Sequence, residues 1–230
     1  MNYKLPNPMA KGRLIFGWIY LAAQQFLIPL LIVLVAALLS LPLNELGLNF
    51  IYFVLNFVVV VTVFASFLAK DLRHFGRHFW RCIGTCLVGI VVYWAANVFF
   101  SIWVALFFPS FSNANDAAIQ IMATENYKLI LVGTVILVPI VEETLFRGVI
   151  YGTFARCSPV LGLICSAVLF SAIHVVGYIG QLSPSHLLVS FLQYIPAGLC
   201  LGWAYAKSGT IFVPILIHTA LNLLAAVAMR

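Results

Sequence analysis

Two adjacent glutamates, Glu142 and Glu143, lie within an apolar stretch and are two of only six acidic residues in the chain. A carboxylate within a membrane span costs several kcal/mol, so such residues usually have a function. Arg147 follows Glu143 by four residues, which allows the two side chains to pair on one helix face. Glu142 is rotated by about 100° from Glu143 on an α-helix. The spacing therefore predicts that Arg147 holds one glutamate while the other, Glu142, remains available for chemistry.

Two further motifs place polar side chains in apolar segments. His174 follows Phe170 by four residues, and Asn222 follows His218 by four, so His218 and Asn222 can point into one cavity. A carboxylate and an imidazole can bind and deprotonate a water, which accelerates hydrolysis by roughly 10²–10⁴-fold. A second imidazole and a carboxamide can donate hydrogen bonds to a developing oxyanion. The combination favours hydrolysis by an activated water.

The same residue types leave a metal open as an alternative. Glu142, His174 and His218 match the His₂Glu ligand set of catalytic zinc. The sequence contains no His-Glu-x-x-His motif. We expect no metal cofactor, with zinc as the alternative.

The elements that carry these residues must be membrane helices. The chain is 64% hydrophobic and 8% charged, whereas soluble domains are about 45–50% apolar and about 25% charged. Its mean hydropathy is +1.11. No segment alternates like a barrel strand, so we expect an all-α, polytopic transmembrane helical bundle. We expect a single integral membrane domain over residues 1–230, with the motifs in a catalytic core at 128–225.

The apolar runs predict about seven membrane helices. The first run is too long for one span and is interrupted by Gln24, Gln25 and Pro29, so residues 14–23 lie at the interface or form a separate short helix, and eight helices are possible. The runs are 14–43, 50–69, 82–108, 129–155, 159–176, 187–206 and 211–229.

The basic residues give the orientation. They account for the formal net charge of +6 and lie in short clusters between apolar runs, which is typical of cytoplasmic loops rather than of a nucleic-acid site. Residues 70–81 are expected to form one such loop, and the loop around Asp116 and Glu125 the opposite side. We therefore predict a multi-pass protein of the cell membrane, in contact with lipids, with a cytoplasmic N-terminus. No feature indicates an oligomeric state.

The three motifs are predicted to lie at similar depths in the membrane. With a rise of 1.5 Å per residue, Glu142 lies about 21 Å, His174 about 24 Å and His218 about 15 Å from the cytoplasmic edge. Three helices thus present ionisable groups at a similar level. Pro139, three residues before Glu142, is expected to free a carbonyl, which is tolerated in a span where it lines a cavity.

Together, the motifs Glu-Glu-x-x-x-Arg, Phe-x-x-x-His and His-x-x-x-Asn at 142–222 resemble the CAAX-protease and bacteriocin-processing (CPBP, Abi-type) family of intramembrane proteases. This family includes the Ras-converting CAAX endoproteases. Residues 1–125 carry no matching motif.

The resemblance implies an intramembrane endopeptidase that cuts near the membrane. In that scheme Glu142 is the general base, aided by His174, and His218 with Asn222 forms the oxyanion hole. Glu143 and Arg147 orient the site or the substrate. The family scheme needs no metal, and the implied substrates are hydrophobic, lipidated or bacteriocin-like peptides.

Two other functions compete with this interpretation. One is a non-catalytic membrane immunity or regulatory protein that retains the family fold. The other is a small transporter that uses Glu142, His174 and His218 as a relay. Inverted repeats would support a transporter, and the sequence shows none.

Overall fold

The helical bundle predicted from composition is present in the computed structural model, which describes residues 7–228. Those residues form helices joined by short connections, with no β-strand among them. The first half comprises α1 (Lys11–Ala22), the π-helix η1 (Ala23–Leu27), α2 (Ile28–Leu38), α3 (Glu45–Val63), α4 (Ala65–Arg77) and α5 (Phe79–Phe107). The second half comprises α6 (Ala114–Leu131), η2 (Val132–Leu137), α7 (Val138–Glu143), η3 (Thr144–Tyr151), α8 (Gly152–Phe154), α9 (Pro159–Val176), α10 (Pro184–Ser208) and α11 (Phe212–Ala228).

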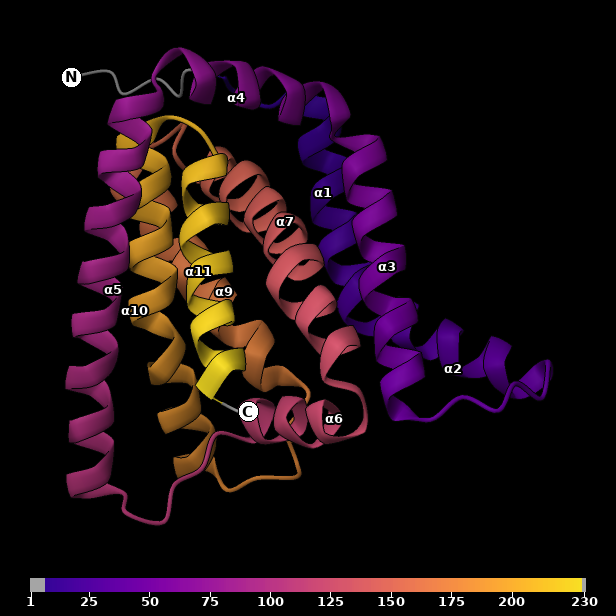
Figure 1. The fold of residues 1–230 in the computed structure, drawn as a ribbon. Helices are drawn as coiled ribbons and strands as arrows, with labels where there is room; N and C mark the ends of the chain where they lie inside the picture. The colour runs from indigo at the N-terminus through magenta and orange to yellow at the C-terminus, as the bar shows by residue number, and fades with distance from the viewer. Residues whose placement is uncertain (1–6, 229–230) are drawn as a thin grey trace.

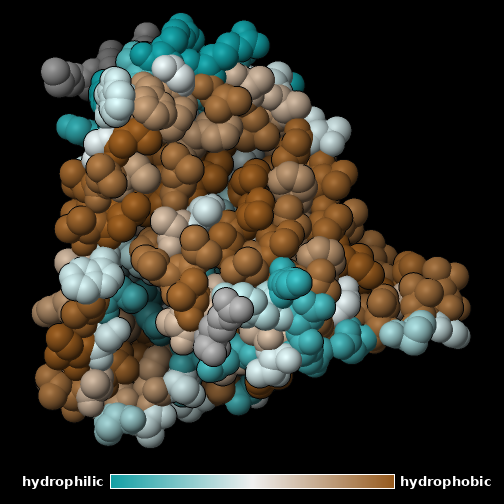
Figure 2. Space-filling view, viewed as in Figure 1, coloured by the Kyte–Doolittle hydropathy of each residue, from teal (hydrophilic) through white to brown (hydrophobic). Residues whose placement is uncertain are grey.

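The surface and the helix lengths identify a multi-pass membrane protein. Six helices within residues 7–228 are long and apolar enough to span a bilayer, and α11 is a shorter apolar helix. Large apolar side chains are exposed around the molecule, and Figure 2 shows them as a broad band between more polar ends. The predicted fold class is confirmed. The predicted count of seven or eight spans is not, because only six helices reach spanning length among the described residues.

The long first apolar run divides near its glutamines, which agrees with the alternative that its first part forms a separate short helix. α1 lies beside α3, whereas α2 points away from the bundle (Figure 1). Gln24 and Gln25 fall in the π-helical turn between them, and Pro29 stands in the first turn of α2. Gln24 is buried and Pro29 lines a cavity described below.

Two segments expected to be loops are helical instead. Residues 65–77 form α4, which lies across one end of the bundle and buries Phe67 and Asp71 while its basic side chains face outward (Figure 1). Residues 114–125 belong to α6, which begins because Asn113 caps it: the Asn113 side chain accepts hydrogen bonds from the backbone N–H groups of Asn115 and Asp116. Polar composition suggested loops, but a cap and one buried face are sufficient for a helix.

The core surrounds η3, in which every residue from Thr144 to Tyr151 is buried. Leu145 and Val149 pack into one hydrophobic cluster with α1, α3 and α4, and Phe146 and Ile150 into a second with α5, α9, α10 and α11. A segment that is buried on all sides is expected only at the centre of such a bundle. The two glutamates therefore precede the most buried turn of the chain.

Candidate active site

Glu143 and Arg147 form the buried ion pair that their spacing predicted. Arg147 Nη1 donates to Glu143 Oε1 at 3.1 Å, and both side chains are fully buried. The structure adds a partner that the sequence did not predict: His218 Nδ1 lies 2.9 Å from the same Oε1. Glu143 thus links η3 to α11.

Arg147 also ties its helix to α9 and α10. Its Nη2 donates to the carbonyl oxygen of Gly198 at 3.2 Å, and its guanidinium carbon lies 4.7 Å from the centre of the Phe170 ring, a cation–π contact. Gly198 is where α10 meets α9, because an added Cβ would lie 2.7 Å from Ala167 Cα. This close approach brings the Gly198 carbonyl within reach of Arg147.

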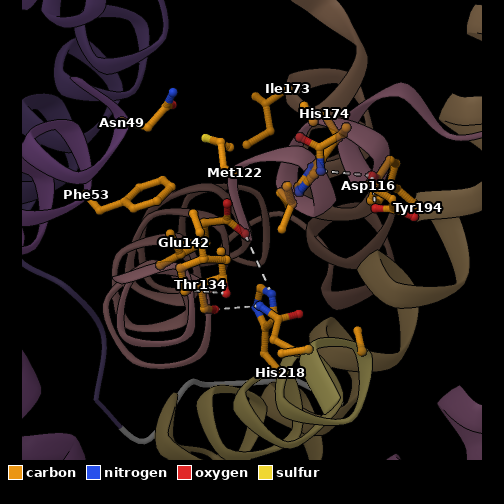
Figure 3. A pocket seen from close by; sticks show the side chains of 18 of the residues that line it. Asn49, Phe53, Asp116, Met122, Thr134, Glu142, Ile173, His174, Tyr194 and His218 are labelled. Atoms are coloured by element: carbon orange, nitrogen blue, oxygen red, sulfur yellow. Dashed lines mark hydrogen bonds and ion pairs between the residues drawn. The ribbon is translucent and has the colours of Figure 1, made fainter. Parts of the chain in front are cut away.

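Glu142, on the neighbouring helix position, faces a cavity of about 1070 Å³. His174, His218 and Asn222 line the same cavity, whereas Glu143 and Arg147 do not. Figure 3 shows the side chains of Glu142, His174 and His218 directed toward the shared space. The structure therefore brings the four predicted catalytic residues to one cavity and places the other two behind it.

His218 stands between the two glutamates. Its Nδ1 contacts Glu143, and its Nε2 lies 3.9 Å from Glu142 Oε2, a buried oxygen without a hydrogen-bond partner among the described residues. In the imidazolium form, His218 and Arg147 balance the formal charges of Glu142 and Glu143. Such pairing is what makes ionised groups tolerable in a low-dielectric interior.

His174 occupies a different part of the cavity wall, on α9. Its Nδ1 lies 2.8 Å from the Phe170 carbonyl oxygen, which can only accept, so Nδ1 carries the proton and Nε2 keeps its lone pair in the neutral ring. The ring stacks on Tyr194 with centroids 4.2 Å apart. A histidine in this tautomer can act as a base through Nε2.

Asn222 supplies a hydrogen-bond donor that is missing from the backbone of the helix that carries Glu142. Residues 132–137 are π-helical, and the Val138 N–H bonds to the Gly133 carbonyl five residues earlier. The next such bond would run from residue 139 to Thr134, but Pro139 has no N–H. Asn222 Nδ2 donates to the Thr134 carbonyl at 2.8 Å instead. One amide proton of Asn222 is thereby fixed, and the second remains for another acceptor.

The alternative of a zinc site requires three ligands within reach of one ion. Among residues 7–228, no three His, Cys, Asp or Glu side chains are grouped closely enough to hold a metal ion. As they stand, Glu142, His174 and His218 are not grouped as a His₂Glu centre, and we derive no step through a metal.

Several site residues were missed from the sequence. Tyr194 of α10 and Asp116 of α6 also line the cavity, and the Tyr194 hydroxyl lies 3.4 Å from Asp116 Oδ1. Thr134 was missed as well, because its contribution is a backbone carbonyl. Composition could have indicated Asp116. The chain has only six acidic residues, so each of them is a candidate site residue, as the glutamate pair is.

Comparison with known proteins agrees with the motifs. Residues 124–224 match the family model described as type II CAAX prenyl endopeptidase Rce1-like. A protein of Lactococcus lactis subsp. lactis (strain IL1403), UPF0177 protein YxdF, is 30% identical over 95 residues, which cover 41% of this chain and 47% of the relative. The chain thus matches about half the length of that relative, and no solved structure gives a significant match. The match confirms the predicted resemblance: residues 124–224 are similar to the Rce1-like CAAX endopeptidases.

Proposed function

We propose that this protein is an intramembrane endopeptidase that hydrolyses a peptide bond with a water activated by Glu142 and His174. The observation that carries the proposal is the division around the glutamate pair. Glu142 lines the cavity with His174, His218 and Asn222, whereas Glu143 is sealed behind it by Arg147. The family match over residues 124–224 supports the same activity.

The residues supply each part of a general-base hydrolysis. Glu142 takes a proton from the water while Nε2 of His174 accepts the other hydrogen bond, and the water oxygen attacks the peptide carbonyl carbon. The oxyanion accepts hydrogen bonds from His218 Nε2–H and from the free amide N–H of Asn222. The tetrahedral intermediate collapses with cleavage of the C–N bond, and the proton held by Glu142 passes to the leaving amine.

The membrane and the cavity define the surroundings of this reaction. We assign the cytoplasmic side to the end that carries α4, because the basic residues meet there: Arg81 donates to the Lys207 carbonyl and Arg156 to the Met9 carbonyl. The protein then belongs to the cell membrane, with its N-terminus in the cytoplasm. Hydrophobic, lipidated or bacteriocin-like peptides are the proposed substrates, because they reach such a cavity from the membrane.

The test is cleavage of membrane-inserted, fluorogenic apolar peptides by the purified protein in lipid nanodiscs. Glu142→Gln and His174→Ala are expected to lower cleavage by roughly 10²–10⁴-fold, the usual contribution of a general base. His78→Ala makes the same histidine-to-alanine change at an exposed position outside the cavity and should leave cleavage unchanged.

A folded Glu142→Gln protein that still cleaves would contradict the proposal. A wild-type protein that cleaves no member of a diverse peptide set, while Glu142→Gln keeps its cellular phenotype, would favour the non-catalytic immunity or regulatory role. Metal dependence is tested in the same assay by a chelator, which should have no effect.

A further inference from the structure

The His174 ring is held by two aromatic neighbours as well as by its hydrogen bond. Phe170 lies 4.7 Å away at an angle of 47°, and Tyr194 stacks at 4.2 Å and 26°. The bond from Nδ1 to the Phe170 carbonyl fixes one edge of the ring. The Tyr194 ring covers one face and thereby limits the directions in which Nε2 can point.

Tyr194 is itself fixed from a different helix. Its hydroxyl contacts three side chains at the start of α6: Asn115 Nδ2 donates to it at 3.2 Å, and the hydroxyl faces Asn113 Oδ1 at 3.2 Å and Asp116 Oδ1 at 3.4 Å. Asn113 Nδ2 also donates to Gln193 Oε1, beside Tyr194, at 2.8 Å. The start of α6 therefore determines where the Tyr194 ring lies.

α6 forms part of the cavity wall. Asp116, Ile119 and Met122 line the cavity, and Figure 1 shows α6 crossing the bundle near the end of α11. The helix bends at Asn126, whose backbone is non-helical. On the near side of this bend, Glu125 Oε2 accepts a hydrogen bond from Asn44 Nδ2. The segment from Ala114 to Glu125 is thus attached at both ends by polar contacts.

We propose that Tyr194 is a positioning residue that orients His174 for catalysis, and that it does so through the contact of its hydroxyl with the start of α6. The inference rests on the proposed endopeptidase function and extends it. It makes α6 part of the catalytic apparatus: when the start of α6 is docked on Tyr194, Nε2 of His174 points into the cavity that α6 lines.

The test combines kinetics with an NMR measurement that does not require catalytic activity. Tyr194→Leu removes the stacked ring, and Tyr194→Phe keeps the ring but removes the hydroxyl. Since a misplacement of about 1 Å can cost about 10²-fold, we expect Tyr194→Leu to lower kcat by roughly 10- to 100-fold with little change in KM. Tyr194→Phe should fall between Tyr194→Leu and the wild type.

The ¹⁵N imidazole spectrum of the histidine-labelled protein reports the ring directly, with the His174 signal assigned by its absence in His174→Ala. The wild type is expected to show a protonated Nδ1 and an unprotonated Nε2 for His174, in one orientation. Tyr194→Leu should broaden or shift this signal. Tyr52→Leu, the same change on α3, should not.

The outcomes separate the two proposals. An unchanged His174 signal in Tyr194→Leu overturns the positioning role, whether or not the protein cleaves peptides. A changed signal together with unaltered kcat overturns it as well. A changed signal in a protein that cleaves no peptide supports positioning and contradicts the endopeptidase function. If Tyr194→Leu does not fold, Tyr194→Phe provides the same readout, and wild-type spectrum and kcat in that variant overturn the role of the hydroxyl.

Discussion

The two adjacent glutamates lie in different environments, because the helix rotates one toward the cavity and the other away from it. Behind the cavity, Glu143 is fully buried: its Oε1 is shared by Arg147 and His218, and its Oε2 has no hydrogen-bond partner among the described residues. On the cavity wall, Glu142 keeps a buried oxygen without a hydrogen-bond partner among the described residues. Both glutamates thus have an oxygen without a partner, but only Glu142 lines the cavity, where such an oxygen can bind water or substrate. The difference teaches that adjacent residues of one type can have separate functions when a helix rotates them apart.

The largest expected effect on stability comes from unpairing the buried side. Arg147→Met removes the cation from Glu143 and should lower the free energy of unfolding by about 3–5 kcal/mol, the usual cost of a broken buried pair. Arg73→Met on the exposed face of α4 serves as the control. Denaturant unfolding in mixed micelles measures both. A loss below about 1 kcal/mol in Arg147→Met would show that Glu143 does not depend on its partner.

Asp71 is a buried carboxylate with no cationic partner among residues 7–228. It accepts hydrogen bonds from Asn7 and from the Ile211 N–H, but burial outweighs them and raises its pKa to about 6. The folded state therefore binds the proton more tightly than the unfolded state, whose pKa is the ordinary 3.8. This stability is fully present below pH 3.8 and is lost as the pH rises through about 6. Thermal unfolding of wild type and Asp71→Asn between pH 4 and 7 should show this decline only in the wild type.

A smaller loss should follow from the backbone defect near Pro139. Asn222→Ala leaves the Thr134 carbonyl without its donor and should cost about 1–3 kcal/mol. Pro139→Ala restores a backbone N–H to the helix, so Asn222→Ala should cost less in that background. A double-mutant cycle measures the coupling. Equal costs of Asn222→Ala in both backgrounds would contradict the explanation given for this contact.

The smallest expected effect concerns the charge of the substrate. The cavity is lined by Glu45, Asp116 and Glu142 but by no Lys or Arg among residues 7–228. A peptide with a cationic end should therefore bind more tightly than the same peptide with a free carboxylate, on the order of tenfold at low salt and less at high salt. Fluorescence binding to the inactive His174→Ala protein, which keeps all three carboxylates, measures the ratio. Tighter binding of the carboxylate form would show that another group neutralises the cavity.

The sequence predicted those parts of the site that depend on one helix. The spacing of Glu143 and Arg147 was sufficient for their ion pair, and the rotation between adjacent positions was sufficient to separate Glu142. The contact between His218 and Glu143 was not predictable, because it depends on how α11 packs against α7 and η3. The same holds for Tyr194 and Asp116, which follow no periodic pattern and meet only in the folded bundle.

The fold was predicted by class but not in detail. Composition and the lengths of the apolar runs indicated membrane helices. They did not indicate α4 or the start of α6, because amphipathic or capped helices with polar faces resemble loops when only hydropathy is considered. The direction of α2 depends on the turn at Gln24–Pro29, whose geometry the residues alone do not determine.

The most direct test compares Glu142→Gln with Glu143→Gln for peptide cleavage and for thermal unfolding. Glu142→Gln is expected to lower kcat by at least about 10²-fold while its unfolding temperature stays at the wild-type value. Glu143→Gln is expected to lower the unfolding temperature by several degrees, since each 1 kcal/mol corresponds to about 2–4 °C in a chain of this size. Wild-type cleavage by a folded Glu142→Gln protein would contradict the central claim that Glu142 is the catalytic member of the pair.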